Sequence, residues 1–210
     1  MKIIDQSWSW VSKPNAPLEV IELAGRTCYK SEDKITKDSS KKFVQVILKK
    51  GHESVIEHMS ASVKFITNRG VTHELVRHRL CAFSQESTRY VNYGGSDIQF
   101  IRPVWIRSGE LKEREIKNDG VARWISACDD AETQYNLLLS CGWRPEQARE
   151  VLPNSLKTEI VVTANLREWR HILRLRTSKA AHPQIRELMV SCLDGFKEAI
   201  PVLFDDINIE

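Results

Sequence analysis

The residues best suited to chemistry lie together near the middle of the chain. Arg77, His78 and Arg79 are consecutive, and Arg89 follows after a segment with several hydroxyl side chains. An amphipathic run, Val71 to Val76, precedes them and is expected to draw the segment toward the protein core. Cationic groups that are drawn inward need anions or well-placed hydrogen-bond partners. The segment is therefore predicted to contact an anionic ligand.

A second group of basic residues occupies a predicted helix that begins near Asn165. One stripe of this helix, at spacings of three, four and three, combines apolar residues with an arginine: Leu166, Trp169, Leu173 and Arg176. Arg176 therefore continues an apolar face, where it either extends to solvent from the helix end or meets an anionic or keto-rich ligand. The other face carries four basic side chains: Arg167, Arg170, His171 and Arg174. Such a like-charged cluster is costly unless it is solvated or faces an anion.

The histidines do not have the spacing of a metal site. A zinc-protease helix requires His-Glu-x-x-His, which places two imidazoles on one face at i and i+4. After His52 the next histidine is His58, and after His73 it is His78, so neither pair has that spacing. No metal is therefore expected. The chain also has no glycine-rich phosphate loop, so a nucleotide would be held by side chains.

The five cysteines are scattered, odd in number and without a C-x-x-C pair. This usage is typical of a reducing compartment, so a cytoplasmic location is expected. No motif marks one of these thiols as an activated nucleophile, and Cys128 lies on an apolar helical stripe, where it is expected to pack in the core. Ser87 has no evident histidine and carboxylate partners, so it is interpreted as a hydroxyl that contacts a ligand.

The composition is that of an ordinary globular protein, with 41% hydrophobic and 28% charged residues. A length of 210 residues without a linker or repeat predicts one domain over residues 1–210. The net charge of +3 gives no global basic field for nucleic acid. The N-terminus lacks the apolar core of a signal peptide, and no apolar run has the length of a membrane span. We therefore expect no nucleic-acid partner and no membrane partner.

These residues are positioned by a predicted α+β fold, in which helices surround a small, mostly antiparallel sheet. Alternating and β-branched patterns predict strands at residues 2–12, 59–67, 86–101 and 157–164. Apolar spacings of three and four predict helices at residues 17–29, 39–50, 71–80, 108–142, 145–151, 166–175 and 183–200. In this arrangement Arg77, His78 and Arg79 lie on one short helix and point in different directions.

The central segment resembles the R-H-R-x7-S signature of the flavin-dependent thymidylate synthases. It contains Arg77-His78-Arg79, then Ser87, and continues with Arg89-Tyr90. Three other segments similar to those of the family follow the expected order: Gly51-His52-Glu53-Ser54 with Glu57-His58, Ala148-Arg149 with Leu152-Pro153, and Asn165-Leu166-Arg167 with His171 and Leu175-Arg176. The matches span residues 51–176.

The chain departs from the fuller family pattern at four positions. Ala82 and Ser84 stand where the family has serine and asparagine. Glu74 stands where the family often has glutamine, and Gln85 where it often has glutamate. These differences concern contacts to uracil and flavin, and they leave the arginines of the signature unchanged.

The resemblance implies a reductive methylation that converts dUMP to dTMP in thymidylate biosynthesis. In this reaction methylenetetrahydrofolate supplies the one-carbon unit and reduced FAD supplies hydride, with NADPH as the reductant of the flavin. The resemblance also implies a homotetramer with active sites at the subunit interfaces.

By matched position, the resemblance also assigns site residues. The predicted FAD contacts are Ser54, Arg77, His78, Arg79, Gln85, Asn165, Arg167 and His171. The predicted dUMP contacts are Glu74, Arg77, Gln85, Ser87, Arg89, Arg149 and Arg176. Arg176 is also assigned the catalytic role: it stabilises charge at the N3/O2 side of the uracil, which favours a nucleophilic C5 without a covalent enzyme adduct. His52 and Tyr90 are assigned to the folate pocket.

Two other functions stay open. The first is a non-enzymatic protein that binds RNA or DNA through basic side chains: Arg77, Arg79, Arg89, Arg167 and Arg174. It predicts steeply salt-dependent binding, and the near-neutral net charge argues against it. The second is a family member that keeps FAD but acts on a different substrate, which the departures at Glu74 and Gln85 favour.

Overall fold

The computed structural model describes residues 1–111 and 118–209 and shows a mixed α+β fold, as predicted. Four antiparallel strands form a sheet in the order β2-β3-β6-β4. Their bounds are Ser7–Ser12 for β2, Ala82–Gln85 for β4, Ser60–Asn68 for β3 and Lys157–Asn165 for β6. A separate two-stranded sheet pairs β1 (Lys2–Ile4) with β5 (Gln99–Ile101) in parallel, with Lys2 opposite Gln99.

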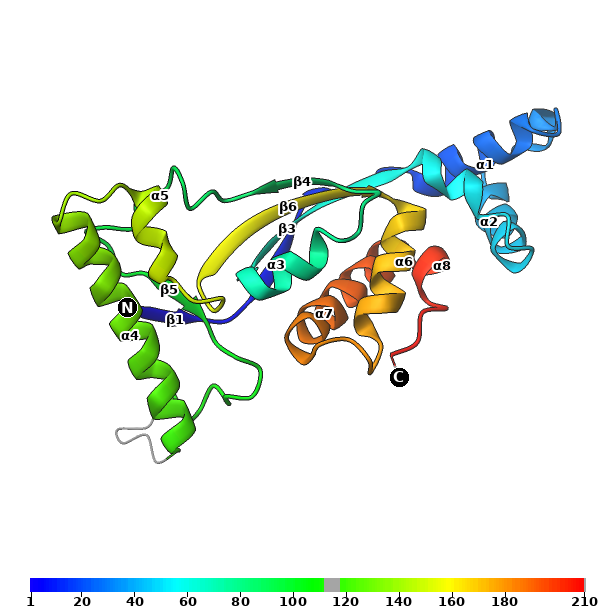
Figure 1. Cartoon of the computed structure of the whole chain (residues 1–210). Helices are drawn as coiled ribbons and strands as arrows, with labels where there is room; N and C mark the ends of the chain where they lie inside the picture. The colour runs from blue at the N-terminus through cyan, green and yellow to red at the C-terminus, as the bar shows by residue number, and fades with distance from the viewer. Residues whose placement is uncertain (112–117, 210) are drawn as a thin grey trace. The chain divides into compact units, whose positions relative to one another are not determined.

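Helices account for most of the remaining described residues (Figure 1). The α-helices are α1 (Pro17–Thr27), α2 (Ser39–Lys49), α3 (Arg69–Leu75), α4 (Asp119–Ser140), α5 (Pro145–Ala148), α6 (Leu166–Thr177), α7 (Pro183–Ala199) and α8 (Pro201–Phe204). Short 3-10 helices are η1 (Glu32–Lys34), η2 (Glu53–His58) and η3 (Arg149–Val151). Among these elements, no helix combines the length and apolar character needed to cross a membrane.

The two long strands β3 and β6 confirm the predicted strands at 59–67 and 157–164. Along each of them, every second residue is buried, because successive side chains of a strand point to opposite faces of the sheet. Figure 1 shows the two strands side by side, with α6 beginning where β6 ends. The regular alternation fixes which side chains face the core, and it places Asn165 at the start of α6.

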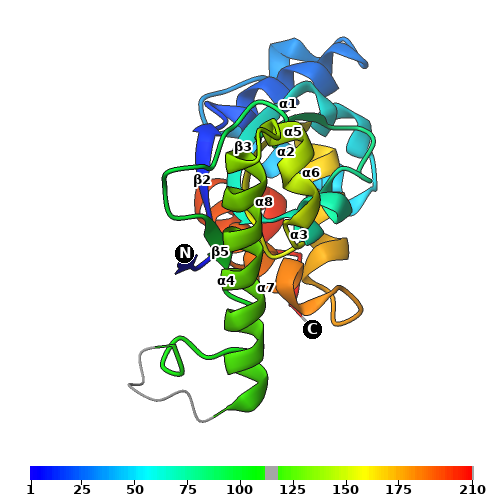
Figure 2. The ribbon, with the colours of Figure 1, turned by 60° about the vertical axis from the view of Figure 1, so that its left-hand side comes forward.

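The described residues group into two compact units. The first unit contains Met1–Ser7, Phe65–Leu75 and Ser84–Ile160, and the second contains Trp8–Lys64, Val76–Phe83 and the chain from Val161 onward. In the first unit, α4 lies alongside α5 (Figures 1 and 2). Its core is formed by Ile98, Phe100, Cys128, Tyr135, Ala148 and Leu156, which confirms the predicted core position of Cys128.

The core of the second unit is built around Trp169 of α6. Its ring centroid lies 5.1 Å from that of Phe196 on α7, and its Nε1 donates a hydrogen bond to the Ala61 carbonyl at 3.0 Å. Phe196 in turn contacts Phe204 at 4.8 Å and Trp10 at 4.6 Å between ring centroids. These contacts fix the rotation of α6 and therefore decide which of its basic side chains face outward.

The predicted helix over 71–80 was wrong at both ends, because α3 runs from Arg69 to Leu75. It starts early since the Asn68 Oδ1 accepts a hydrogen bond from the Val71 backbone N–H at 2.8 Å, which satisfies a free donor of the first turn. Residues 77–79 consequently lie in a turn after the helix, so the three signature residues do not share a helical surface.

The predicted strands at 2–12 and 86–101 were also partly wrong. The first is interrupted at residues 5–6, where the chain changes partner: β1 pairs with β5, and β2 with β3. The second is replaced by β4 before residue 86 and β5 after residue 98. Pairing of β4 with β6 is a non-local interaction that a local pattern does not reveal.

The long predicted helix over 108–142 begins later than expected. Residues 108–111 lie outside helix, in turn or irregular structure, and residues 112–117 lie outside the described residues. Helix α4 begins at Asp119 because the Asn118 Oδ1 accepts a hydrogen bond from the Gly120 backbone N–H at 3.0 Å. The remaining predicted helices match the observed ones within a few residues.

Candidate active site

Helix α6 positions the basic residues of the second unit. The Asn165 Oδ1 caps it by accepting a hydrogen bond from the Glu168 backbone N–H at 2.8 Å. Leu166, Trp169 and Leu173 are fully buried, which confirms the predicted apolar stripe. Arg176 continues that stripe and is half-buried.

A cavity of about 650 Å³ lies beside this helix in the second unit. Its lining brings together three predicted FAD contacts: Asn165, Arg167 and His171. Arg174, Leu80 and three carboxylates complete the lining: Glu53, Glu57 and Glu168. The G-H-E segment and the N-x-R segment are over a hundred residues apart in sequence, and they meet here.

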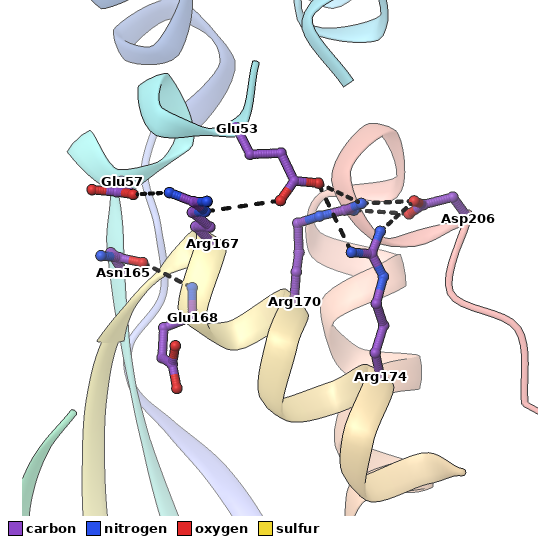
Figure 3. A network of polar contacts seen from close by, with 8 residues as sticks. All are labelled: Glu53, Glu57, Asn165, Arg167, Glu168, Arg170, Arg174 and Asp206. Atoms are coloured by element: carbon purple, nitrogen blue, oxygen red, sulfur yellow. Dashed lines mark hydrogen bonds and ion pairs between the residues drawn. The ribbon is translucent and has the colours of Figure 1, made fainter. Parts of the chain in front are cut away.

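The acidic side chains of the G-H-E segment pair with the arginines of α6 (Figure 3). Arg167 donates a hydrogen bond to the Glu57 carboxylate, and its Nε lies 3.9 Å from Glu53 Oε2. Glu53 Oε1 also lies 3.7 Å from Arg170 Nη2 and 3.8 Å from Arg174 Nη1. The basic face of α6 thus meets carboxylates supplied by the chain itself.

Arg170 is 1% exposed, so of the two environments left open for the basic cluster, solvent or an anion, this residue has the second. Its Nη1 and Nη2 donate to the two oxygens of Asp206 at 2.8 and 2.6 Å, and Arg174 Nη2 donates to the same carboxylate at 2.9 Å. Burial alone raises the pKa of Asp206, but the hydrogen bonds and charges of Arg170 and Arg174 lower it overall. Asp206 is therefore an anion that stabilises the arginine cluster.

His78 is the buried member of the signature, while Arg77 and Arg79 on either side of it are exposed. The Arg176 Nε donates a hydrogen bond to His78 Nε2 at 3.0 Å. The ring of His171 lies 5.8 Å from that of His78, at an interplanar angle of 71°. Burial, together with the charges of Arg176 and His171, lowers the pKa of His78 to about 4. His78 is therefore neutral at pH 7.

Ser54 lies in a neighbouring part of the second unit. It lines a cavity of about 440 Å³ that it shares with Arg167 and His52. The second unit thus contains most of the predicted FAD contacts: Ser54, Arg77, His78, Arg79, Asn165, Arg167 and His171. The predicted catalytic residue, Arg176, belongs to the same unit.

The first unit contains a smaller cavity of about 270 Å³ around Arg149, which Glu150 also lines, with its Oε1 3.6 Å from Arg149 Nε. Arg149 Nη1 donates a hydrogen bond to the buried hydroxyl of Thr88 at 3.1 Å. Arg69 and His73 line the same cavity. Among the described residues, the buried Nη1 of Arg69 has no hydrogen-bond partner. Two guanidinium groups and a hydroxyl in a small cavity are suited to a phosphate group.

Sequence reasoning missed Arg69. Its only local signal is an Asn-Arg-Gly turn pattern at residues 68–70, which says nothing of burial. The Arg69 backbone N–H bonds to the Asn154 carbonyl at 3.0 Å, and this contact brings the residue close to the segment that carries Arg149. A pairing of segments this distant in sequence cannot be read from either segment alone.

The other predicted dUMP contacts of the first unit are Glu74, Gln85, Ser87 and Arg89. Gln85 Nε2 donates within the unit, to Thr72 Oγ1 at 3.0 Å and, more weakly, to Thr158 Oγ1 at 3.3 Å. Arg89 is exposed, and its guanidinium lies 5.3 Å from the Tyr90 ring centroid.

Ser87 holds the turn that presents Arg89. Its Oγ accepts a hydrogen bond from the Arg89 backbone N–H at 3.3 Å, and its carbonyl accepts from the backbone N–H groups of Tyr90 and Val91. Glu74 is half-buried on α3.

Comparison with solved structures identifies the class of fold. The crystal structure of a UMP/dUMP methylase, PolB from Streptomyces cacaoi bound with 5-Br dUMP, matches with a TM-score of 0.80 and 24% identity, over 98% of this chain and 96% of that chain. Among curated proteins, flavin-dependent thymidylate synthases are similar in sequence. The Corynebacterium efficiens protein is 33% identical over 97% of this chain and 85% of its own length. The Mycolicibacterium vanbaalenii protein is 37% identical over 95% and 83%.

The family described as "Thymidylate synthase complementing protein" matches residues 10–202. The chain belongs to this family, that of the flavin-dependent thymidylate synthases, which confirms the resemblance seen in the signature segments.

Proposed function

We propose that the protein is a flavin-dependent thymidylate synthase that converts dUMP to dTMP, with methylenetetrahydrofolate as the one-carbon donor. The observation that carries the proposal is the cavity in which the family's G-H-E and N-x-R segments meet. The family match over residues 10–202 supports it independently.

FAD fits the donor set of the second unit. Its pyrophosphate needs cationic hydrogen-bond donors, and the cavity beside α6 offers Arg167, Arg174 and His171. In the proposal Ser54, Arg77, His78, Arg79, Asn165, Arg167 and His171 hold the cofactor. When bound, FAD supplies the hydride chemistry. Arg167 also pairs with the carboxylates of Glu53 and Glu57, which line the same cavity.

The phosphate of dUMP fits the cavity of the first unit. Arg149 is the predicted contact there, and the unpaired Nη1 of Arg69 supports a second one. Each charge-assisted hydrogen bond contributes roughly 1.5–3 kcal/mol. In the proposal the remaining dUMP contacts are Glu74, Arg77, Gln85, Ser87, Arg89 and Arg176.

Arg176 is proposed as the catalytic residue. Its Nε is bonded to His78, which orients the plane of the guanidinium group. Fixed donors that meet developing charge lower an activation barrier more than mobile ones do. The proposed role is to stabilise negative charge at the N3/O2 side of the uracil, so that C5 becomes nucleophilic.

Other parts of the proposal come from the family resemblance. They are NADPH as the reductant, a folate pocket with His52 and Tyr90, and a homotetramer with active sites at subunit interfaces. The proposal also includes a cytoplasmic location, from the cysteine usage, and a single domain over residues 1–210, from the chain length. We expect neither nucleic acid nor a membrane as a partner.

The test is spectroscopic. The purified protein should absorb in the visible range of flavins, or should gain this absorbance when reconstituted with FAD. Without oxygen, reduced enzyme should then be reoxidised only when dUMP and methylenetetrahydrofolate are both present, with formation of dTMP. A protein that takes up no FAD would overturn the proposal. If FAD binds but dUMP causes no spectral change, the family member with a different substrate becomes the better explanation.

A further inference from the structure

The carboxylate of Glu168 lies on the side of His78 opposite Arg176. Glu168 is 8% exposed, and its Oε1 is 3.6 Å from His78 Nδ1. Arg176 Nε is 3.0 Å from His78 Nε2. The three side chains therefore lie in a row of carboxylate, imidazole and guanidinium, in which Arg176 and His78 share a hydrogen bond and Glu168 lies at ion-pair distance from His78. The family resemblance assigns no role to Glu168.

The position of Glu168 is fixed by its helix. Its backbone N–H donates to the cap residue Asn165 at 2.8 Å, and the next residue is the fully buried Trp169. Burial raises the pKa of Glu168, while the positive charge of His171 opposes that rise. Cys81 also lies near this carboxylate, and burial with the Glu168 charge raises the pKa of its thiol to about 12. The thiol is therefore protonated at neutral pH and adds no second anion.

The hydrogen bond from Arg176 determines the protonation of His78. A guanidinium group only donates, so His78 Nε2 must be the bare, accepting nitrogen. A neutral imidazole then carries its proton on Nδ1, the nitrogen that faces Glu168. Burial and the charges of Arg176 and His171 disfavour the imidazolium form. The carboxylate thus stabilises the one tautomer that accepts from Arg176.

The same residues resemble a metal site with two histidines and one carboxylate. Among the described residues, ligand-type atoms of His78, Glu168 and His171 lie within 4.8 Å of one another. A metal at His78 Nδ1 would have to displace the proton that the Arg176 hydrogen bond places there. It would also lie near the guanidinium charge. The proton on Nδ1 and the nearby guanidinium charge favour a neutral His78 between Glu168 and Arg176 over a bound cation.

We propose that Glu168 is a positioning residue for catalysis: it holds His78 in the Nδ1–H tautomer, so that Nε2 accepts from Arg176 and orients its guanidinium group. The inference rests on the proposed function, because the role of Arg176 at the uracil comes from that proposal. The tautomer of His78 can be measured without any turnover, so the role of Glu168 and the proposed function can fail separately.

The experiment compares wild type with Glu168→Gln and Glu168→Leu in the FAD-loaded protein. A glutamine at position 168 presents both a hydrogen-bond donor and an acceptor to His78 Nδ1, and a leucine presents neither. In both variants kcat for dUMP should fall about ten- to a hundredfold, as for other residues that orient a catalytic group. The kcat values are compared at saturating FAD, because Glu168 also lines the cavity beside α6. Glu198→Gln is the matched control, since Glu198 is exposed on α7 of the same unit and lines none of the cavities described above.

Nitrogen-15 NMR of histidine-labelled protein gives the structural readout, with His78 assigned by comparison with His78→Gln. Wild type should show the Nδ1–H tautomer at His78, and both Glu168 variants should lose that preference. An Nε2–H tautomer in wild type would overturn the inference, as would variants that keep full kcat. Stoichiometric metal in wild type that is absent from Glu168→Leu would also overturn it and favour the metal site. If wild type binds FAD but does not turn over dUMP, the proposed function fails, while the NMR result still decides whether Glu168 sets the tautomer of His78.

Discussion

Replacing Asp206 with asparagine should destabilise the second unit, because this carboxylate pairs with a buried arginine. Asparagine has nearly the same size as aspartate but carries no charge and has one acceptor oxygen in place of two. In the wild type, Arg170 donates to both oxygens of Asp206, at 2.8 and 2.6 Å. Arg174 adds a third hydrogen bond at 2.9 Å.

The magnitude follows from the burial of the two partners. Arg170 is 1% exposed and cannot regain water, and its next carboxylate, Glu53, is 3.7 Å away. Breaking a fully buried ion pair costs roughly 3–5 kcal/mol. The Asp206 side chain is 49% exposed, so solvent screens part of that interaction, and the asparagine oxygen keeps one hydrogen bond. We therefore expect a loss of about 1–2 kcal/mol in the free energy of unfolding, or roughly 2–8 °C in Tm.

The pH dependence has a definite sign. The pKa of Asp206 is lower in the folded protein than in the unfolded chain, so the pair stabilises the fold wherever the unfolded aspartate is ionised. The difference between wild type and Asp206→Asn should be constant above pH about 5. It should shrink as the pH falls below about 4, the ordinary pKa of aspartate, toward the lower folded-state value.

Urea unfolding followed by tryptophan fluorescence measures this difference, with both proteins free of flavin. Asp205→Asn is the matched control, because Asp205 is adjacent and exposed. If Asp206→Asn and Asp205→Asn unfold at the same urea concentration at pH 7, the carboxylate does not stabilise Arg170 and the reasoning is refuted. If wild type and Asp206→Asn differ equally in free energy of unfolding at pH 7 and pH 3.5, the carboxylate stabilises the fold but not through its charge.

Three further predictions concern the site and the core. Arg176→Ala should lower dUMP turnover by roughly a hundredfold or more while FAD stays bound, as measured by steady-state kinetics and flavin absorbance; near-normal turnover contradicts the catalytic role. Arg149→Gln and Arg69→Leu should each weaken dUMP binding about ten- to a hundredfold in spectroscopic titrations. Arg69→Leu should do so without lowering the urea midpoint, because its buried Nη1 has no hydrogen bond to lose among the described residues; a lowered midpoint with unchanged dUMP affinity would indicate a structural role. Gly195→Ala would place a Cβ 2.1 Å from Trp8 Cη2 and should cost about 1–3 kcal/mol in urea unfolding, whereas an unchanged midpoint would mean that Trp8 moves freely aside.

The parts of the fold that sequence predicted well have strong local patterns. β3 and β6 alternate buried and exposed residues along their length, and α6 has a continuous apolar stripe. These patterns are set by which face of each element meets the core. β4 has only four residues and is defined by its pairing with β6. No local pattern determines such a pairing, so the prediction placed a strand after residue 86 instead.

In the candidate site, too, local spacing predicted some features, while others depend on contacts between distant segments. The spacing of Arg167 and His171 predicts that both lie on one face of the helix, and both line one cavity. The spacing of Arg170 left its environment open between solvent and an anion, because its partner Asp206 is 36 residues away in sequence. Glu168 gave no signal, since an acidic residue in the first turn of a helix is ordinary. Its importance appears only when His78 is placed beside it.

Helix α6 carries several positive charges within three turns, and their partners differ in kind. Arg167 pairs with Glu57, while Arg170 and Arg174 pair with Asp206. These carboxylates offset the repulsion that like charges on one helix would otherwise cause. Arg176 instead donates to a neutral imidazole, which orients the guanidinium group without cancelling its charge. The hydrogen bond to His78 thus fixes the direction of the guanidinium group, as a role in stabilising an anionic uracil requires.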